Sequence, residues 1–167
     1  MRISGSGVTR TLHWIIAACI LAVLGSGYAA TRSPVFALPV LQIHLTFGLS
    51  AGLLSLVRVM IWFTKGAPQP VFPVTSRLQF LASKLVHGLL RLLPLILLAS
   101  GLGMILLSDS LDAITDGTLT GLTAFSDVPP RNLHHAAALL LLLLTGLHIA
   151  AALWHSSRKA GYGTDQL

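Results

Sequence analysis

Four long apolar segments constrain this chain more than any other feature of its sequence. They cover about residues 11–31, 39–63, 78–107 and 132–155. A helix rises about 1.5 Å per residue, so each segment is near or above the roughly 20 residues that cross about 30 Å of hydrocarbon. The segments predict an all-α membrane protein, a four-helix transmembrane bundle that forms a single domain over residues 1–167.

The first segment also has features of a secretory signal peptide, because Arg2 and Arg10 precede it and small residues end it. Its apolar run is long for a signal peptide. We therefore expect a transmembrane helix there.

The composition supports a membrane protein and argues against a nucleic-acid-binding one. Only 10% of the residues are charged, whereas soluble domains carry about 25%. The net charge of +6 comes from basic residues scattered around the apolar segments, with no basic run interleaved with aromatics. Cys19 stands alone, so no internal disulfide, cysteine-based zinc site or covalent haem attachment is expected.

The basic residues also predict how the bundle is oriented. Arg32 and Arg131 fall at one end of the predicted bundle, whereas the other end collects Arg2, Arg10, Arg58, Lys65, Arg77, Lys84, Arg158 and Lys159. Lys and Arg mark the cytoplasmic side, which also holds the predicted belt of Trp14, Trp62 and Trp154. We expect a multi-pass membrane protein with both termini in the cytoplasm. The connection over about residues 108–131 is expected to hold a short surface helix.

Seven histidines in so apolar a chain are the main chemical signal. An ionisable residue inside a bilayer is costly and indicates function, although a single histidine also serves to hydrogen-bond a neighbouring helix. His13 and His44 lie early in helices that enter from opposite sides, so they are expected at opposite depths. The last helix supplies a ring at each depth, with His134 and His135 near the outside and His148 toward the cytoplasm.

Helical periodicity selects His134 over His135. His134 and His148 are fourteen residues apart, which at 100° per residue returns to within about 40° of one face, about 21 Å along the axis. His135 falls on another face. The pattern predicts that His13 with His148, and His44 with His134, each bind one haem iron through two imidazoles, an arrangement typical of electron carriers.

Arg58 follows His44 by fourteen residues and is expected on the same interior face. A buried arginine there needs an anion, and a haem propionate is the expected partner, with snorkelling to lipid headgroups as the alternative. Gly48 and Gly52 would let either a macrocycle or a neighbouring helix approach closely.

A quinone site is predicted beside the haem on the cytoplasmic side. A quinone headgroup needs hydrogen-bond donors and a proton route at the interface, and the residues expected to supply them are His155, Arg77, Lys84 and His87. Simple contact with lipid phosphates is the alternative for Arg77 and Lys84.

These residues together resemble a known family. Arg10-Thr-Leu-His13-Trp14, His44 followed by Gly48 and Arg58, and the pair His134 and His148 are similar to the prokaryotic cytochrome b561 family, which is related to the cytochrome subunits of nickel hydrogenases and formate dehydrogenases. The resemblance spans all four segments. It implies a four-helix bundle in the bacterial inner membrane, with two haems b ligated at His13, His44, His134 and His148. Arg10 is counted with Arg58 among the residues that bind the cofactor.

In small stand-alone members the implied activity is oxidation of superoxide at the periplasmic side, with ubiquinone as electron acceptor. With four helices and no partner-docking extension, the chain is expected to belong to that class. One feature disagrees: a basic mouth would steer superoxide, yet the outer connections carry Arg32 and Arg131 against Asp109, Asp112, Asp116 and Asp127. Either the two arginines form a local funnel, or the donor is another molecule.

Two alternatives remain open at this point. One is a cytochrome subunit that anchors a hydrogenase or dehydrogenase partner and passes its electrons to quinone. The other is a haem-free channel or packing protein whose histidines only bridge helices.

Overall fold

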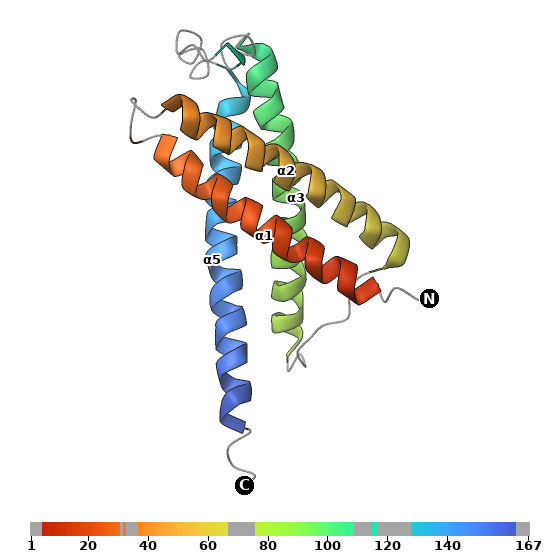
Figure 1. Ribbon diagram of the computed structural model, residues 1–167. Helices are drawn as coiled ribbons and strands as arrows, with labels where there is room; N and C mark the ends of the chain where they lie inside the picture. The colour runs from red at the N-terminus through yellow and green to blue at the C-terminus, as the bar shows by residue number, and fades with distance from the viewer. Residues whose placement is uncertain are drawn as a thin grey trace.

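The computed structural model describes residues 5–30, 32, 37–66, 76–108, 115–116 and 128–162. The long helices in these residues are α1 (Gly5–Ala30), α2 (Ala37–Lys65), α3 (Arg77–Leu107) and α5 (Pro130–Tyr162) (Figure 1). All four are long and apolar enough to cross a membrane. The prediction of an all-α protein with four membrane-spanning helices is therefore confirmed for the part of the chain described.

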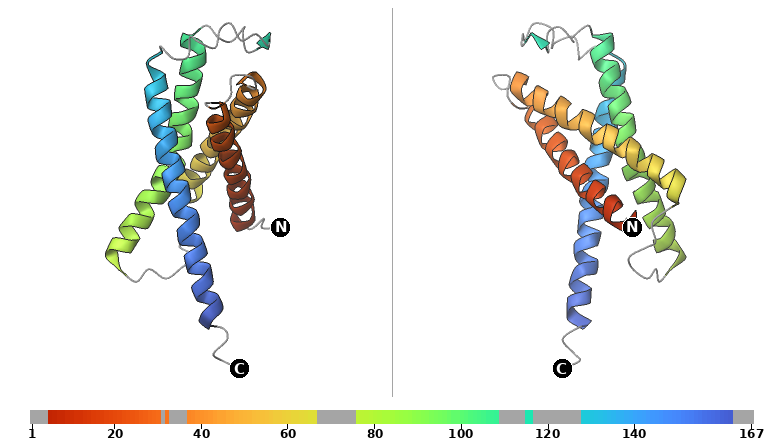
Figure 2. Two further views of the ribbon diagram at one scale, coloured as in Figure 1. Left: turned by 90° about the vertical axis from the view of Figure 1, so that its left-hand side faces the viewer. Right: turned by 45° about the vertical axis from the view of Figure 1, so that its right-hand side comes forward.

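The helices form two crossing layers. α1 packs along α2, α3 packs along α5, and α2 makes the main contact between the two pairs. Figure 2 shows that the α1–α2 hairpin lies obliquely across the α3–α5 pair. In Figure 1 the start of α1 lies at the right, below the middle of the molecule, and the end of α5 lies at its lower end.

Local sequence signals set the end of α2 and the start of α3. α2 ends before Gly66, whose φ of 82° is in the left-handed region that favours glycine. The Gly66 amide donates to the Trp62 carbonyl oxygen at 2.9 Å. α3 begins after Ser76, whose side-chain oxygen accepts a hydrogen bond from the Gln79 amide.

Pro94 lies inside α3, where it is buried. A proline in a helix interior removes one backbone hydrogen bond and bends the helix. The two halves of α3 diverge in direction in Figure 2, and the half from Arg77 to Pro94 swings away from α5. The bend therefore decides where the side chains of this half of α3 meet the other helices.

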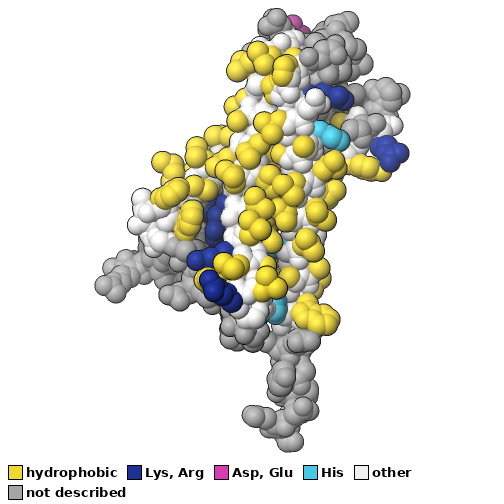
Figure 3. Space-filling view, turned by 180° about the vertical axis from the view of Figure 1, so that it is seen from behind, with side chains coloured by type: hydrophobic (Ala, Val, Ile, Leu, Met, Phe, Trp, Pro, Cys, Tyr) yellow, Lys and Arg dark blue, Asp and Glu magenta, His cyan; other side chains and the backbone are white. Residues whose placement is uncertain are grey.

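The core is small and lies between the two layers. Among the described residues its buried apolar members are Ile16, Cys19, Ile20, Ala51, Leu93, Ala137, Leu141 and Leu144. Many large apolar side chains instead point outward; Leu78 is 79% exposed and Phe63 76%. Figure 3 shows apolar side chains covering much of the face seen from behind. An apolar exterior of this extent suits a lipid surround.

The observed helices are longer than the predicted segments. α1 begins before residue 11 and α5 continues past residue 155. The difference arises because hydropathy locates the part of a helix that crosses hydrocarbon, while polar turns continue beyond it. The predicted surface helix between residues 108 and 131 falls mostly outside the described residues.

Candidate functional site

One face of α5 carries a histidine toward each end of the core. His134 and His148 are half-buried, and the face between them holds Ala137, Leu141 and Leu144, which are 5%, 1% and 7% exposed. The spacing alternates between three and four residues, which keeps all five side chains on one stripe of a helix. The stripe thus separates two imidazoles by an apolar layer.

One of two histidine pairs joins the layers near the starts of α2 and α5, which lie toward the top of Figure 1. The ring centroids of His44 on α2 and His134 on α5 are 6.2 Å apart, with an angle of 63° between the ring planes. We call these two residues the upper pair.

Hydrogen bonds fix the orientation of both rings in the upper pair. Nδ1 of His44 lies 3.0 Å from the carbonyl oxygen of Val23, so it must carry the proton and donate it. Nδ1 of His134 lies 3.0 Å from Oγ of Ser100, whose own hydroxyl donates to the Ile96 carbonyl oxygen at 2.8 Å. Both Nδ1 atoms therefore act as donors, which leaves the Nε2 lone pair of each ring for a metal.

The lower pair consists of His13 on α1 and His148 on α5. Their ring centroids are 6.3 Å apart and their planes are nearly perpendicular, at 86°. Here Nη1 of Arg58 lies 3.2 Å from Nδ1 of His13. A guanidinium only donates, so Nδ1 of His13 accepts, and the proton of this neutral ring is on Nε2. The lower pair has the spacing of the upper one with the opposite tautomer at His13.

Both spacings suit a metal bound between two imidazoles. A metal–imidazole bond of about 2.0 Å on each side holds two ring centroids about 6 Å apart. Among the described residues, no cluster of three or more His, Cys, Asp or Glu side chains is placed to hold a bare metal ion. Pairs of imidazoles fit an iron whose remaining positions are filled by a porphyrin.

Small residues let the upper rings lie close to the neighbouring backbones. A Cβ added at Gly27 of α1 would meet Cε1 of His44 at 3.0 Å, and one at Gly101 of α3 would meet His134 at 3.4 Å. Gly52 has a different role, because a Cβ there would lie 2.7 Å from Leu98 of α3. In this structure Gly52 serves helix packing, the second of the two roles considered for it.

Thr145 has a buried hydroxyl one turn before His148. Hydroxyls elsewhere in the helices, such as those of Ser26 and Ser50, donate to a carbonyl oxygen four residues earlier. The Thr145 oxygen has no hydrogen-bond partner among the described residues. Buried polar atoms are nearly always paired, so this one is suited to meet a bound group or water.

His87 of α3 comes close to the lower pair. Its ring centroid is 5.2 Å from that of His148, although the side chain is exposed overall. Nδ1 of His87 lies 2.7 Å from the Ser83 carbonyl oxygen and donates to it. Sequence reasoning assigned His87 to a quinone site; the structure puts it beside a predicted haem ligand.

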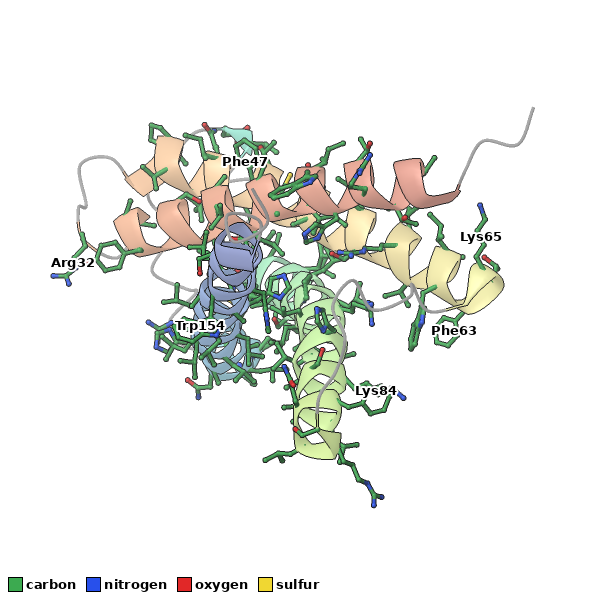
Figure 4. The ribbon with its side chains drawn as sticks, turned by 90° about the horizontal axis from the view of Figure 1, so that it is seen from below. Arg32, Phe47, Phe63, Lys65, Lys84 and Trp154 are labelled. Carbon is green, nitrogen blue, oxygen red and sulfur yellow. The ribbon has the colours of Figure 1, made fainter. Side chains whose placement is uncertain are left out.

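The other residues predicted for the quinone site are more dispersed. Arg77 is exposed at the first residue of α3, and the Lys84 ammonium lies 4.6 Å from the Phe80 ring centroid on its own helix. Figure 4 shows Lys84 pointing away from the other helices. His155 is half-buried near the end of α5. The quinone site stays a prediction.

The structure also locates five other residues that the sequence analysis named. His135 is exposed, unlike its neighbour His134, and Arg10 is exposed on α1. Arg32 and Arg131 are both exposed at the upper end, as is Asp116. Asp109, Asp112 and Asp127 lie outside the described residues.

Sequence reasoning missed the groups that support the rings. The Val23 carbonyl and Ser100 are found only through the packing of α1 on α2 and of α3 on α5. Arg91 had a signal, because it is a charged residue in the middle of an apolar segment. It had no role in the prediction from sequence.

Comparison with known proteins gave one finding. A family model described as prokaryotic cytochrome b561 matches residues 5–162. Searches of curated proteins and of solved structures gave no match. The matched range includes all four membrane-spanning helices and both histidine pairs.

Proposed function

We propose that this chain, which belongs to the prokaryotic cytochrome b561 family, transfers single electrons from periplasmic superoxide to ubiquinone through two haems b. Membership of the family implies b-type haem and electron transfer in a bacterial membrane. The number of haems, the donor and the acceptor are our proposal. The observation that supports it most is that two pairs of imidazole rings lie at the two ends of one stripe of α5. The ring centroids are 6.2 Å apart within the upper pair and 6.3 Å apart within the lower pair.

The residues present fit a haem at each pair. His44 with His134, and His13 with His148, would hold the two haem irons, and the unpaired Thr145 hydroxyl lies close to the lower pair along α5. Haem b bound at these pairs would supply one-electron redox chemistry.

The protein's own groups orient the rings and separate the two sites. The Val23 carbonyl and Ser100 hold the protons of the upper rings on Nδ1. Such bonds also make the ligating nitrogen more basic. His134 and His148 are about 21 Å apart along α5, and the buried side chains of Leu141 and Leu144 form an apolar layer between the two pairs.

The direction of transfer follows from the proposed orientation. The basic residues of the lower end favour the cytoplasmic side, which leaves the upper pair near the periplasm. Each of two superoxide ions would lose one electron and become dioxygen. The quinone would gain the two electrons, together with two protons taken up at the cytoplasmic side through residues such as His87 and His155.

Spectroscopy of the purified protein tests this function. A pyridine haemochrome assay should find haem b, and superoxide mixed in a stopped-flow instrument should reduce it before added ubiquinone reoxidises it. Haem that superoxide does not reduce, but that a large co-purifying hydrogenase or dehydrogenase does reduce, would identify an anchor subunit instead. Protein without haem would contradict both.

A further inference from the structure

Two arginines on neighbouring helices have no acidic partner among the described residues. Arg58 of α2 and Arg91 of α3 are both half-buried, and Arg91 lies against Trp62, which is one helical turn beyond Arg58 on α2. The chain has five acidic residues and none lies in α1, α2, α3 or α5; they are Asp109, Asp112, Asp116, Asp127 and Asp165. No carboxylate on a neighbouring helix is therefore available to balance the pair.

Arg91 is half-buried in the middle of α3. It is fourteen residues into the helix, about 21 Å along the axis from Arg77. A partly buried charge in a membrane helix is costly unless it meets an anion or a polar cavity. In Figure 3 several Lys and Arg side chains lie in a hollow between apolar side chains.

The position of Arg91 is fixed by an aromatic ring. Its guanidinium carbon lies 5.2 Å from the centroid of the Trp62 ring on α2. Trp62 follows Arg58 by one helical turn, so both project from the same side of α2. Stacking on an aromatic face holds a guanidinium in place and leaves the N–H groups at its edge free to donate.

The partner of Arg58 in this structure also indicates an anion. Arg58 donates to Nδ1 of His13, which puts the proton of that ring on Nε2. If His13 is to bind a metal through Nε2, the proton must be on Nδ1, and Arg58 can no longer donate there. The guanidinium then needs another acceptor close to the lower pair.

We propose that Arg58 and Arg91 form a two-guanidinium site for the carboxylates of the haem bound at the lower pair, with Arg91 a propionate-binding residue. The inference rests on the proposed function. Guanidinium groups bind carboxylates through paired charge-assisted hydrogen bonds, which a single lysine ammonium does not reproduce. Arg91 then helps retain the lower haem and raises its midpoint potential, because a nearby positive charge favours the reduced state.

The test compares Arg91→Gln and Arg91→Lys with a control variant, Lys65→Gln. The control removes an exposed positive charge from the end of α2 that also carries Arg58. Redox titration of Arg91→Gln should give a lower midpoint potential for one haem and an unchanged one for the other. Resonance Raman spectra should show a shifted propionate-bending band. Arg91→Lys should restore the potential but not the band, and Lys65→Gln should match the wild type.

A His148→Ala background assigns the effect to the lower haem. With that haem lost, Arg91→Gln should leave the potential of the remaining haem unchanged. Native mass spectrometry tests whether the anion is a lipid phosphate instead. If the wild type retains an anionic phospholipid that Arg91→Gln loses, while the haem spectra stay the same, the ligand is lipid phosphate and the proposal is wrong. An unchanged propionate band in Arg91→Gln also overturns it. Haem-free wild-type protein would instead contradict the proposed function itself.

Discussion

The ring centroids of His44 and His134 lie 6.2 Å apart across the two layers of the bundle, and each ring donates its Nδ1 proton to the other helix of its own layer. His44 donates to the Val23 carbonyl of α1 and His134 to Ser100 of α3. All four helices therefore contribute to the upper pair. This sharing makes the pair sensitive to changes that do not touch either histidine.

His134 and His135 give the sharpest test of the helical register. The His134→Ala variant should lose the upper haem, because it removes one of the two imidazoles proposed to bind it, a ring that is half-buried against Ser100. The His135→Ala variant should keep both haems, because that ring is exposed. Haem per chain, measured by pyridine haemochrome, checks both. Loss of haem from the His135→Ala variant alone would show that the register is wrong.

Ser100 should tune the upper haem without binding it. Ser100→Ala removes the acceptor of the His134 Nδ1 proton, so the ring is less firmly oriented and its Nε2 less basic. Haem affinity at the upper pair should fall by about tenfold or more, and its midpoint potential should rise. Haem transfer to apomyoglobin and a redox titration measure these changes. The control is Ser50→Ala, whose hydroxyl is exposed and donates to its own helix; equal effects in both variants would contradict the role of Ser100.

Gly27 should be required for the upper site. In Gly27→Ala the new Cβ would meet the His44 ring at 3.0 Å and push it from its position. We expect the upper haem to be weakened or lost while the lower haem keeps its spectrum. Gly25→Ala is the matched control, because nothing lies within 4 Å of a Cβ there. If both variants bind two haems with wild-type affinity, the close approach of Gly27 has no bearing on the site.

Gly52 should matter for stability and not for haem chemistry. A Cβ at Gly52 would lie 2.7 Å from Leu98, so Gly52→Ala forces α2 and α3 apart and costs about 1–3 kcal/mol. The midpoint of thermal unfolding in detergent should fall. Gly146→Ala, which meets nothing within 4 Å, should leave it unchanged or raise it. A Gly52→Ala protein as stable as the wild type would remove the packing role.

Arg32 and Arg131 test the superoxide donor. If these exposed residues steer an anion, replacing both with glutamine should slow haem reduction by superoxide and weaken its dependence on salt. Stopped-flow traces at several ionic strengths measure both effects. Rates identical to those of the wild type at low salt would show that the arginines do not steer the donor.

The sequence predicts the helices well because membrane crossing leaves a direct record in hydropathy. It predicts the stripe of α5 for a similar reason: fourteen residues is close to a whole number of turns, and the structure has both His134 and His148 half-buried on that face. That these residues ligate haem remains a prediction. The oblique crossing of the α1–α2 hairpin is not recorded in hydropathy, because it depends on how side chains such as Leu98 meet Gly52.

The supporting contacts of the site are the part that sequence could not supply. His87 sits at the correct depth for the lower pair, but depth alone does not say which neighbour it touches. Its contact with His148 depends on the direction of the first half of α3, which Pro94 bends. The partner of Arg58 is likewise decided by packing between α1 and α2.

The haem count of the wild type and of two single variants tests the central claim most directly. The account predicts two haems b per chain in the wild type by pyridine haemochrome, and one in each of His44→Ala and His148→Ala, with the two remaining haems differing in midpoint potential. A wild type without haem, or variants that both retain two haems, would contradict it.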